Sequence, residues 1–278
     1  MEARLDALLS RVRTDRVSGA AQVAEYVAEA LADYVGHPDG DASSVREFAF
    51  AAYRARRSMA TLFVLLNGVL DELPDLAAVR RRAVDFMKEQ RDADGLISEA
   101  FSSLEVPRDV LTISNSSTVA AALLAASKKR PRLRAVVMES RPGGEGKRMA
   151  ERLSEAGIEC EIIADSMVFE AARSCGCAVC GADCIVPGYL VNKVGTAALA
   201  HASIAAGIPL HSLASSEKIV GVDISDPVVR TKRQDGRTVR TQVFERVPLE
   251  LMTDLVTDKG VLRPEDLEFP AGPYPLLA

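Results

Sequence analysis

The first third of the chain carries a hydrophobic pattern typical of amphipathic helices. Apolar residues recur at three- and four-residue spacing over positions 20–34, which predicts a helix with one buried face. A capping-box pattern at 44–47 predicts the start of a second helix that continues to Leu66. Pro74 then precedes a third apolar stripe, and a glycine-containing connection at 94–107 is expected to end the helical region.

From residue 110 onward, short apolar runs alternate with segments of helical length. This alternation is typical of a parallel β-sheet whose two faces are covered by helices. A further strand is expected at 239–245, after a polar hairpin-like stretch. We therefore predict an α/β protein with a helical N-terminal domain at 1–106 and a parallel-sheet domain at 107–278. The predicted strands of the parallel sheet lie at 110–113, 135–138, 158–163, 178–179 and 209–213.

Composition and charge narrow the classes of function. The 278 residues include 34 Lys and Arg against 39 Asp and Glu, a formal net charge of −5 at pH 7. Direct nucleic-acid binding through a global basic field is therefore not expected. No stretch approaches the roughly 18 uninterrupted apolar residues of a membrane span, and the charged N-terminus is unlike a secretory signal. We expect a cytoplasmic protein without a membrane partner.

Four of the five cysteines lie within positions 175–184 and suggest a metal site. The residues around them are apolar, however, and predict a buried strand and its turn. A strand sends neighbouring side chains to opposite faces, so these thiols would not converge on one ion. We expect buried core thiols and no metal, with a metal or redox role as the alternative.

Each predicted strand is followed by a polar cluster that contains hydroxyls, glycines or cations. The carboxyl ends of parallel strands meet at one edge of a sheet, which is the usual place for a ligand. Helix amide groups, the helix dipole and a Lys or Arg together suit a phosphate group. Ser or Thr before a helix can also act only as an N-cap, so each cluster alone admits both interpretations. The clusters include Ser114, Asn115, Ser116, Arg141, Glu145, Asp183, Asn192, Lys193 and Lys218.

Asp183 follows a predicted buried strand directly and is the strongest candidate for acid–base chemistry. A desolvated carboxylate there could donate or accept a proton, although turn capping is the alternative. His201 lies in an Ala-rich segment and is expected to be packed. The chain contains no GxGxxG fingerprint, Walker sequence or G-x-S-x-G elbow, which argues against dinucleotide, P-loop and serine-hydrolase sites. No cofactor is expected.

Six motifs in chain order resemble those of one known family. They read LTISNSSTV, ESRPGGEG, DS, GAD, NKVGT and VPLELMTDLVTDKGVL, and they lie within 111–262. The family unites the alpha, beta and delta subunits of eukaryotic translation initiation factor 2B with isomerases of methylthioribose 1-phosphate and ribose 1,5-bisphosphate. The resemblance implies a helical N-terminal domain, a Rossmann-like C-terminal domain with a phosphosugar-type pocket, and assembly into a homodimer or larger homo-oligomer.

The resemblance also assigns roles to individual residues. In the isomerases a Cys and an Asp form the acid–base pair; the Asp maps to Asp183, and the Cys maps to Ser114, so a hydroxyl replaces the thiol. Ser is a far weaker acid than Cys and needs an activating base. Lys193 corresponds to the family's phosphate lysine, and Glu145 stands where the isomerases commonly carry Gln. The other implied substrate or phosphate contacts are Arg57, Arg141 and Ser18-Gly19-Ala20, where the bisphosphate enzyme has Arg-Gly-Ala and where Arg16 is a candidate replacement for that Arg.

These residues favour an initiation factor 2B-like subunit that binds a phosphorylated sugar or nucleotide and acts in regulation, since it lacks the isomerase thiol. The alternative is an aldose–ketose isomerase, an intramolecular oxidoreductase acting on a ribose phosphate. In that alternative Asp183 is the acid–base group, and Ser114 or water replaces the thiol. A third hypothesis is an assembly subunit with a vestigial pocket.

Overall fold

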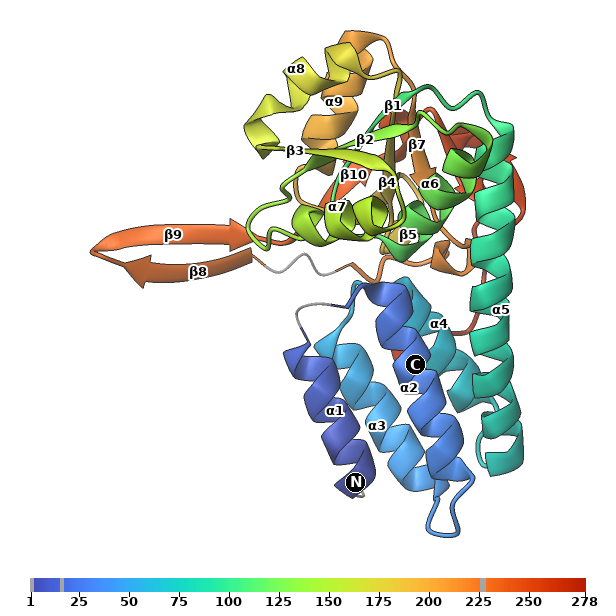
Figure 1. Ribbon diagram of the computed structural model, residues 1–278. Helices are drawn as coiled ribbons and strands as arrows, with labels where there is room; N and C mark the ends of the chain where they lie inside the picture. The colour runs from blue at the N-terminus through green and yellow to red at the C-terminus, as the bar shows by residue number, and fades with distance from the viewer. Residues whose placement is uncertain (1–2, 16–17, 226–228) are drawn as a thin grey trace.

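A bundle of helices forms the N-terminal part of the computed structural model, which describes residues 3–15, 18–225 and 229–278. Four helices lie side by side, and a longer one runs along them and continues beyond the bundle (Figure 1). Phe48, Phe63 and Phe86 are fully buried in the bundle core, as the spacing of apolar residues predicts. The helices are α1 (Ala3–Thr14), α2 (Ala20–Val35), α3 (Ala42–Ala55), α4 (Ala60–Asp71) and α5 (Leu76–Ser103).

The single long helix predicted from residue 44 to Leu66 is wrong, because the chain breaks between α3 and α4. Asp41, not a Ser at 44, is the N-cap of α3, and its carboxylate accepts a hydrogen bond from the Ser44 amide at 2.8 Å. At the break, Arg56 Nε donates to the Val12 carbonyl at 2.8 Å. This tertiary contact with α1 helps to hold a turn in a segment without Pro or Gly.

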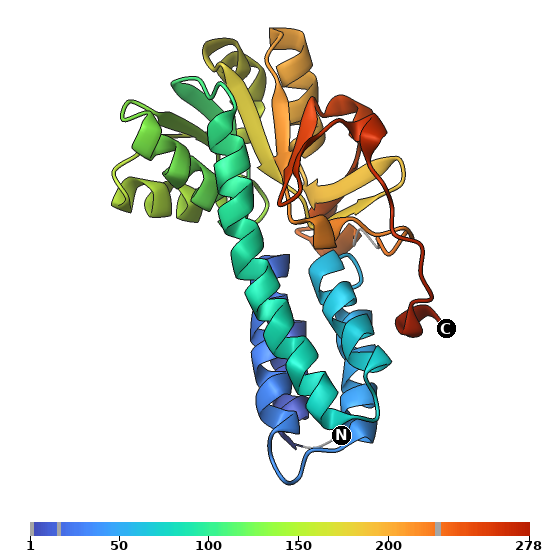
Figure 2. The same cartoon turned by 90° about the vertical axis from the view of Figure 1, so that its right-hand side faces the viewer.

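Helix α5 links the two parts of the molecule. The segment 94–107 was expected to be a connection, but α5 continues into it and ends only at Ser103. The reason is burial, because Ile97 and Phe101 on its last turns are fully buried against the sheet, and this outweighs the cost of about 1 kcal/mol for Gly95 inside a helix. Figure 2 shows α5 passing from the bundle to the sheet as one unbroken helix.

The main sheet has seven strands in the order β12-β11-β7-β4-β1-β2-β3, and only β12 pairs antiparallel to its neighbour. Counted in chain order, its six parallel strands have the order 3-2-1-4-5-6 of a Rossmann-type sheet. This confirms the predicted fold class. The strands are β1 (Asp109–Thr112), β2 (Arg134–Met138), β3 (Glu159–Ile163), β4 (Cys177–Gly181), β7 (Leu210–Leu213), β11 (Asp254–Thr257) and β12 (Gly260–Leu262).

Helices cover both faces of this sheet, as a parallel sheet requires. One buried cluster joins the sheet to α6, α7 and the end of α5, and a second joins it to α8 and α9. Among the described residues, no helix combines the length and apolarity needed to cross a membrane. The covering helices are α6 (Ser117–Lys129), α7 (Gly146–Glu155), α8 (Val168–Ser174) and α9 (Thr196–Ala206).

A second, three-stranded sheet lies between the main sheet and the bundle, and the hydrophobic pattern did not predict it. Its order is β10-β6-β5, with β5 at Cys184–Val186, β6 at Tyr189–Lys193 and β10 at Phe244–Pro248. Cys184, Val186 and Val191 of this sheet belong to the same buried cluster as the helices of the bundle. The small sheet therefore joins the two parts through a shared core.

The strand predicted at 239–245 is divided in two. Strand β9 (Arg237–Gln242) pairs with β8 (Val229–Gln234) in an arm that projects from the molecule, while β10 returns to the small sheet (Figure 1). Asp235 and Gly236 at the tip have φ values of 50° and 74°, which suit a tight two-residue hairpin turn. The hairpin-like character of this polar segment is thus confirmed.

The cysteine cluster forms part of the core. Cys175, Cys177, Cys180 and Cys184 are all buried and unbridged. Burial raises the pKa of the Cys180 thiol to about 12, so the thiol stays protonated at neutral pH and is a poor nucleophile. Within the described residues, no group of three or more His, Cys, Asp or Glu is arranged to hold a metal ion.

Candidate functional site

A cavity of about 420 Å³ lies where the helical bundle meets the carboxyl edge of the main sheet. It opens at the junction of β1 and β4, the point where the strand order reverses and where sheets of this type bind ligands. The N-terminal ends of α2, α4, α6 and α7 contribute residues to its wall, as do the ends of β4 and β6. The fold thus brings loops and helix N-termini from both parts of the chain to one space.

Twelve of the thirteen predicted site residues line this cavity. The structure therefore gathers positions that are as far apart in the sequence as Ser18 and Lys218. The twelve are Ser18, Gly19, Ala20, Arg57, Ser114, Asn115, Ser116, Glu145, Asp183, Asn192, Lys193 and Lys218.

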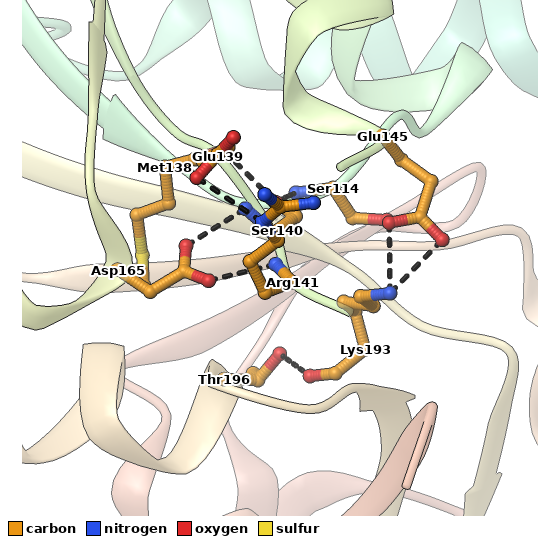
Figure 3. Close-up of polar contacts among 9 residues, drawn as sticks. All are labelled: Ser114, Met138, Glu139, Ser140, Arg141, Glu145, Asp165, Lys193 and Thr196. Atoms are coloured by element: carbon orange, nitrogen blue, oxygen red, sulfur yellow. Dashed lines mark hydrogen bonds and ion pairs between the residues drawn. The ribbon is translucent and has the colours of Figure 1, made fainter. Parts of the chain in front are cut away.

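Arg141 is the predicted residue that does not line the cavity. Its side chain is exposed, with Nε 3.4 Å from an oxygen of Glu139. Its backbone amide donates to Asp165 Oδ2 at 2.7 Å, and the Ser140 amide donates to Asp165 Oδ1 at the same distance (Figure 3). Asp165 therefore fixes the loop after β2, and the loop directs the Arg141 guanidinium toward solvent.

The ends of β1 and β2 are held in an uncommon backbone conformation. Ser114 and Ser140 have φ values of 70° and 67°, in the left-handed region that residues other than glycine seldom adopt. Hydrogen bonds hold them there, because the Ser114 amide donates to Ser140 Oγ at 2.7 Å and Ser140 Oγ donates to the Met138 carbonyl at 2.9 Å (Figure 3). Such strain is typical of functional sites, and here it places Ser114 at the cavity wall.

In the described part of the chain, the Ser114 hydroxyl is not hydrogen-bonded to an activating base. Among the described residues, no side chain forms a hydrogen bond with Ser114 Oγ. His201 is exposed on α9, contrary to the expectation that it is packed. His211 is buried, but it pairs with Asp254 at 2.7 Å and does not line the cavity. Ser114 therefore lacks the partner that makes a serine nucleophilic or acidic near neutral pH.

Asp183 lies at the cavity wall between the bundle and the sheet. Its carbonyl accepts a hydrogen bond from the Ala60 amide at the start of α4, at 3.0 Å. Burial raises the pKa of its carboxyl to about 6, although Lys218, Lys193 and a hydrogen bond from the Ala20 amide all act to lower it. A carboxyl group with this pKa can exchange a proton near neutral pH.

Lys193 is almost fully buried and forms an ion pair with Glu145. Lys193 is 2% exposed, and its Nζ lies 2.9 Å from Oε1 and 2.7 Å from Oε2 of Glu145 (Figure 3). Glu145 has room to adopt this position because Gly143 lacks a side chain, and a Cβ at Gly143 would overlap the Glu145 carboxylate. The charge of Lys193 is therefore compensated within the protein.

The start of α9, immediately after Lys193, is also occupied by a carboxylate. Glu245 of β10 accepts hydrogen bonds from the amides of Gly195 at 2.8 Å and Ala197 at 2.9 Å. Asn192 donates to Thr196 Oγ1 at 2.9 Å, and Thr196 donates to the Lys193 carbonyl at 2.6 Å. Two of the amides at the start of α9 are thus already bound by a carboxylate.

Lys218 presents the opposite case. It is 5% exposed and lines the cavity, yet the described part of the chain offers its ammonium group no hydrogen bond and no ion pair within 4.0 Å. Burial lowers the pKa of Lys218, and the charges of Asp183, Asp94 and Glu217 oppose this effect from longer range. An unpaired buried cation is costly, and an anionic ligand would compensate it.

The structure adds cations to the site that sequence reasoning missed. Arg13, Arg54 and Arg56 line the cavity, together with the acidic Asp15. Among the described lining residues, six Lys and Arg side chains face three carboxylates, so the wall carries a surplus of positive charge that suits an anion. The Arg-rich string at 54–57 was the available signal. Arg16, the candidate replacement for the missing family Arg, lies outside the described residues.

A comparison with protein families decides the relationship. The model of the Initiation factor 2 subunit family matches residues 17–264, most of the chain. The chain belongs to this family. The match covers α2 to α5, the sheet and the cavity residues from Ser18 onward, so the family relationship includes all of the candidate site except Arg13 and Asp15.

Relatives within the family carry names of two kinds. A "Putative translation initiation factor eIF-2B subunit 2-like" protein of Pyrococcus abyssi is 28% identical over 269 residues, covering 94% of this chain and 97% of the relative. A "Ribose 1,5-bisphosphate isomerase" of Archaeoglobus fulgidus is 28% identical over 287 residues, covering 95% and 91%. The crystal structure of the Pyrococcus horikoshii translation initiation factor eIF-2B matches with a TM-score of 0.88 at 25% identity, covering 96% and 100%.

Proposed function

We propose that this chain is an initiation factor 2B-like regulatory subunit that binds a phosphorylated sugar or nucleotide without isomerising it. Residues 1–106 and 107–278 would act as two domains that share the cavity. The observation that carries the proposal is the cavity itself, because its wall combines surplus positive charge with a Ser114 hydroxyl that forms no hydrogen bond to a base among the described residues. Binding of a phosphate ester needs the charge, whereas turnover would need the acid–base pair.

Phosphorus NMR of the purified protein tests this proposal. The protein is mixed in turn with ribose 1,5-bisphosphate, methylthioribose 1-phosphate and AMP. We expect at least one ligand to show a broadened or shifted phosphorus signal, with no ketose phosphate signal after prolonged incubation. If all three signals keep their free positions and widths, the cavity is not a phosphate-ester site and an assembly role is favoured.

The isomerase alternative has one observation in its favour. Burial raises the pKa of Asp183 to about 6, which makes it a competent acid–base group at neutral pH. Appearance of ketose phosphate in the same NMR samples would establish turnover, and Asp183→Asn should then abolish it. If the natural protein is inactive but Ser114→Cys gains turnover, the thiol was the missing part and the regulatory proposal stands.

The proposal includes assembly of the chain into a homodimer or larger homo-oligomer, as the resemblance implies. Sedimentation velocity at micromolar concentration tests this directly. A single species of the monomer mass, 29.8 kDa, would contradict it.

A further inference from the structure

We propose that the Lys193–Glu145 pair selects a sugar monophosphate, whose hydroxyl groups bind this pair while its single phosphate group pairs with Lys218. The inference rests on the proposed function, since it names the class of phosphorylated sugar that the same cavity takes. It follows from a difference between two buried lysines that line the same cavity: Lys193 is paired with Glu145, whereas Lys218 forms no ion pair among the described residues.

The Lys193 end of the cavity is unsuited to a phosphate group. Both carboxylate oxygens of Glu145 lie within 2.9 Å of Lys193 Nζ, so a phosphate brought to Lys193 would also face a carboxylate. A phosphate monoester carries nearly two negative charges at pH 7, and the like charges would repel. A hydroxyl group differs, because it both donates and accepts a hydrogen bond. The ion pair offers one partner for each role.

The Lys218 end has the opposite character. Lys218 is buried at 5% exposure, and none of the described residues gives its ammonium group a hydrogen bond or an ion pair within 4.0 Å. A phosphate oxygen at this place would form a charge-assisted hydrogen bond in a poorly hydrated site, where such bonds are strong. The Lys193–Glu145 pair is therefore prepared for hydroxyl groups, and Lys218 is prepared for an anion.

Two substitutions can free Lys193 without removing it. Glu145→Gln keeps the size of the side chain and removes its charge. Gly143→Ala adds a Cβ that overlaps the end of the flexible Glu145 side chain, so Glu145 must turn away from Lys193 while the backbone stays in place. Either change should leave Lys193 with an uncompensated charge, so that Lys193 can accept a phosphate group.

The experiment is isothermal titration calorimetry of the full chain with ribose 1-phosphate and ribose 1,5-bisphosphate at pH 7.5. We expect the natural protein to bind ribose 1-phosphate at least tenfold more tightly than the bisphosphate. Glu145→Gln and Gly143→Ala should each tighten bisphosphate binding at least tenfold, because each leaves Lys193 free to pair with the second phosphate group. Lys218→Met should weaken monophosphate binding at least tenfold, whereas Lys129→Met, at an exposed lysine on α6, should leave both affinities unchanged.

The outcomes separate this inference from the proposed function. Tighter binding of the bisphosphate by the natural protein would overturn the inference alone, as would a bisphosphate affinity that neither Glu145→Gln nor Gly143→Ala improves. Unchanged monophosphate binding in Lys218→Met would overturn the assignment of the phosphate to Lys218. Failure of both probes to bind any protein in the set, with folding verified by circular dichroism, would overturn the inference, and failure of methylthioribose 1-phosphate and AMP as well would overturn the proposed function.

Discussion

The two buried lysines of the cavity have nearly the same exposure but opposite electrostatic settings. Lys193 is 2% exposed and holds Glu145 with two contacts below 3 Å, whereas Lys218 is 5% exposed and forms no ion pair within the described structure. Both act on Asp183, and Lys218 lowers the pKa of that carboxyl more than Lys193 does. The comparison teaches that lining a pocket does not make a cation available to a ligand; its partners decide that.

The largest expected effect comes from removing each lysine in turn. Lys193→Met should lower the free energy of unfolding by about 3 kcal/mol, because it leaves the Glu145 carboxylate buried without its partner. Lys218→Met should leave the free energy of unfolding unchanged or raise it by about 1 kcal/mol, since it removes a buried charge that forms no close ion pair among the described residues and interacts with Asp183 only at longer range. Urea unfolding followed by circular dichroism measures both values.

A double substitution controls this experiment. Replacing Lys193 and Glu145 together by Met should recover most of the loss, because the pair is removed as a unit and apolar groups of similar size take its place. Equal losses of stability in Lys193→Met and Lys218→Met would contradict the distinction between a paired and an unpaired lysine.

A smaller effect is expected in the pH dependence of stability, which reports the burial of Asp183 against the opposing charges of the lysines. The pKa of this carboxyl is about 6 in the folded protein and about 3.9 in an unfolded chain. The folded state therefore holds more protons between pH 4 and 6, and the stability that this group contributes falls as the pH rises through that window. Asp183→Asn should match the natural protein at pH 4 and exceed it by about 2 kcal/mol at pH 7.

An exposed carboxylate provides the control for the pH series. Asp33 on α2 is exposed, and Asp33→Asn is measured at each pH as the control for the loss of one carboxylate charge. Thermal unfolding at half-unit steps of pH gives the required curves. A constant difference between Asp183→Asn and the natural protein would show that Asp183 does not titrate in this window.

The smallest effect concerns Glu245, which accepts hydrogen bonds from two amides at the start of α9. Glu245→Gln should lower the free energy of unfolding by about 1 kcal/mol, because it removes a charged acceptor of two amides at the start of α9. Glu250→Gln, at an exposed position in the same segment of the chain, is the matched control. Identical unfolding curves for the two variants would indicate that Glu245 does not stabilise the helix.

Much of the fold could be predicted from local pattern, because buried parallel strands and amphipathic helices have distinct hydrophobic periods. The predictions failed where distant contacts decide the local structure. The break after Ala55 depends on the hydrogen bond from Arg56 to Val12, 44 residues away. The small sheet was missed although Pro187 and Gly188 marked the turn between its strands β5 and β6.

The candidate site was likewise predictable from the sequence only in part. The members on the sheet side were predictable, because strand ends of a parallel sheet converge and polar residues follow each of them, whereas Arg13, Arg54 and Arg56 of the bundle were missed. Its charge pattern was not predictable, because the Lys193–Glu145 pair joins residues 48 positions apart, and nothing local in the sequence shows that Lys218 lacks such a partner. Arg141 illustrates the limit, since the contact of its backbone with Asp165 sends its side chain out of the cavity.

A crystal structure of the natural protein with ribose 1-phosphate would test the difference between the two lysines most directly. The account predicts a phosphate oxygen within hydrogen-bond distance of Lys218 Nζ, sugar hydroxyl groups at the Lys193–Glu145 pair, and that pair intact. A phosphate bound to Lys193 with the Glu145 carboxylate turned away would contradict it.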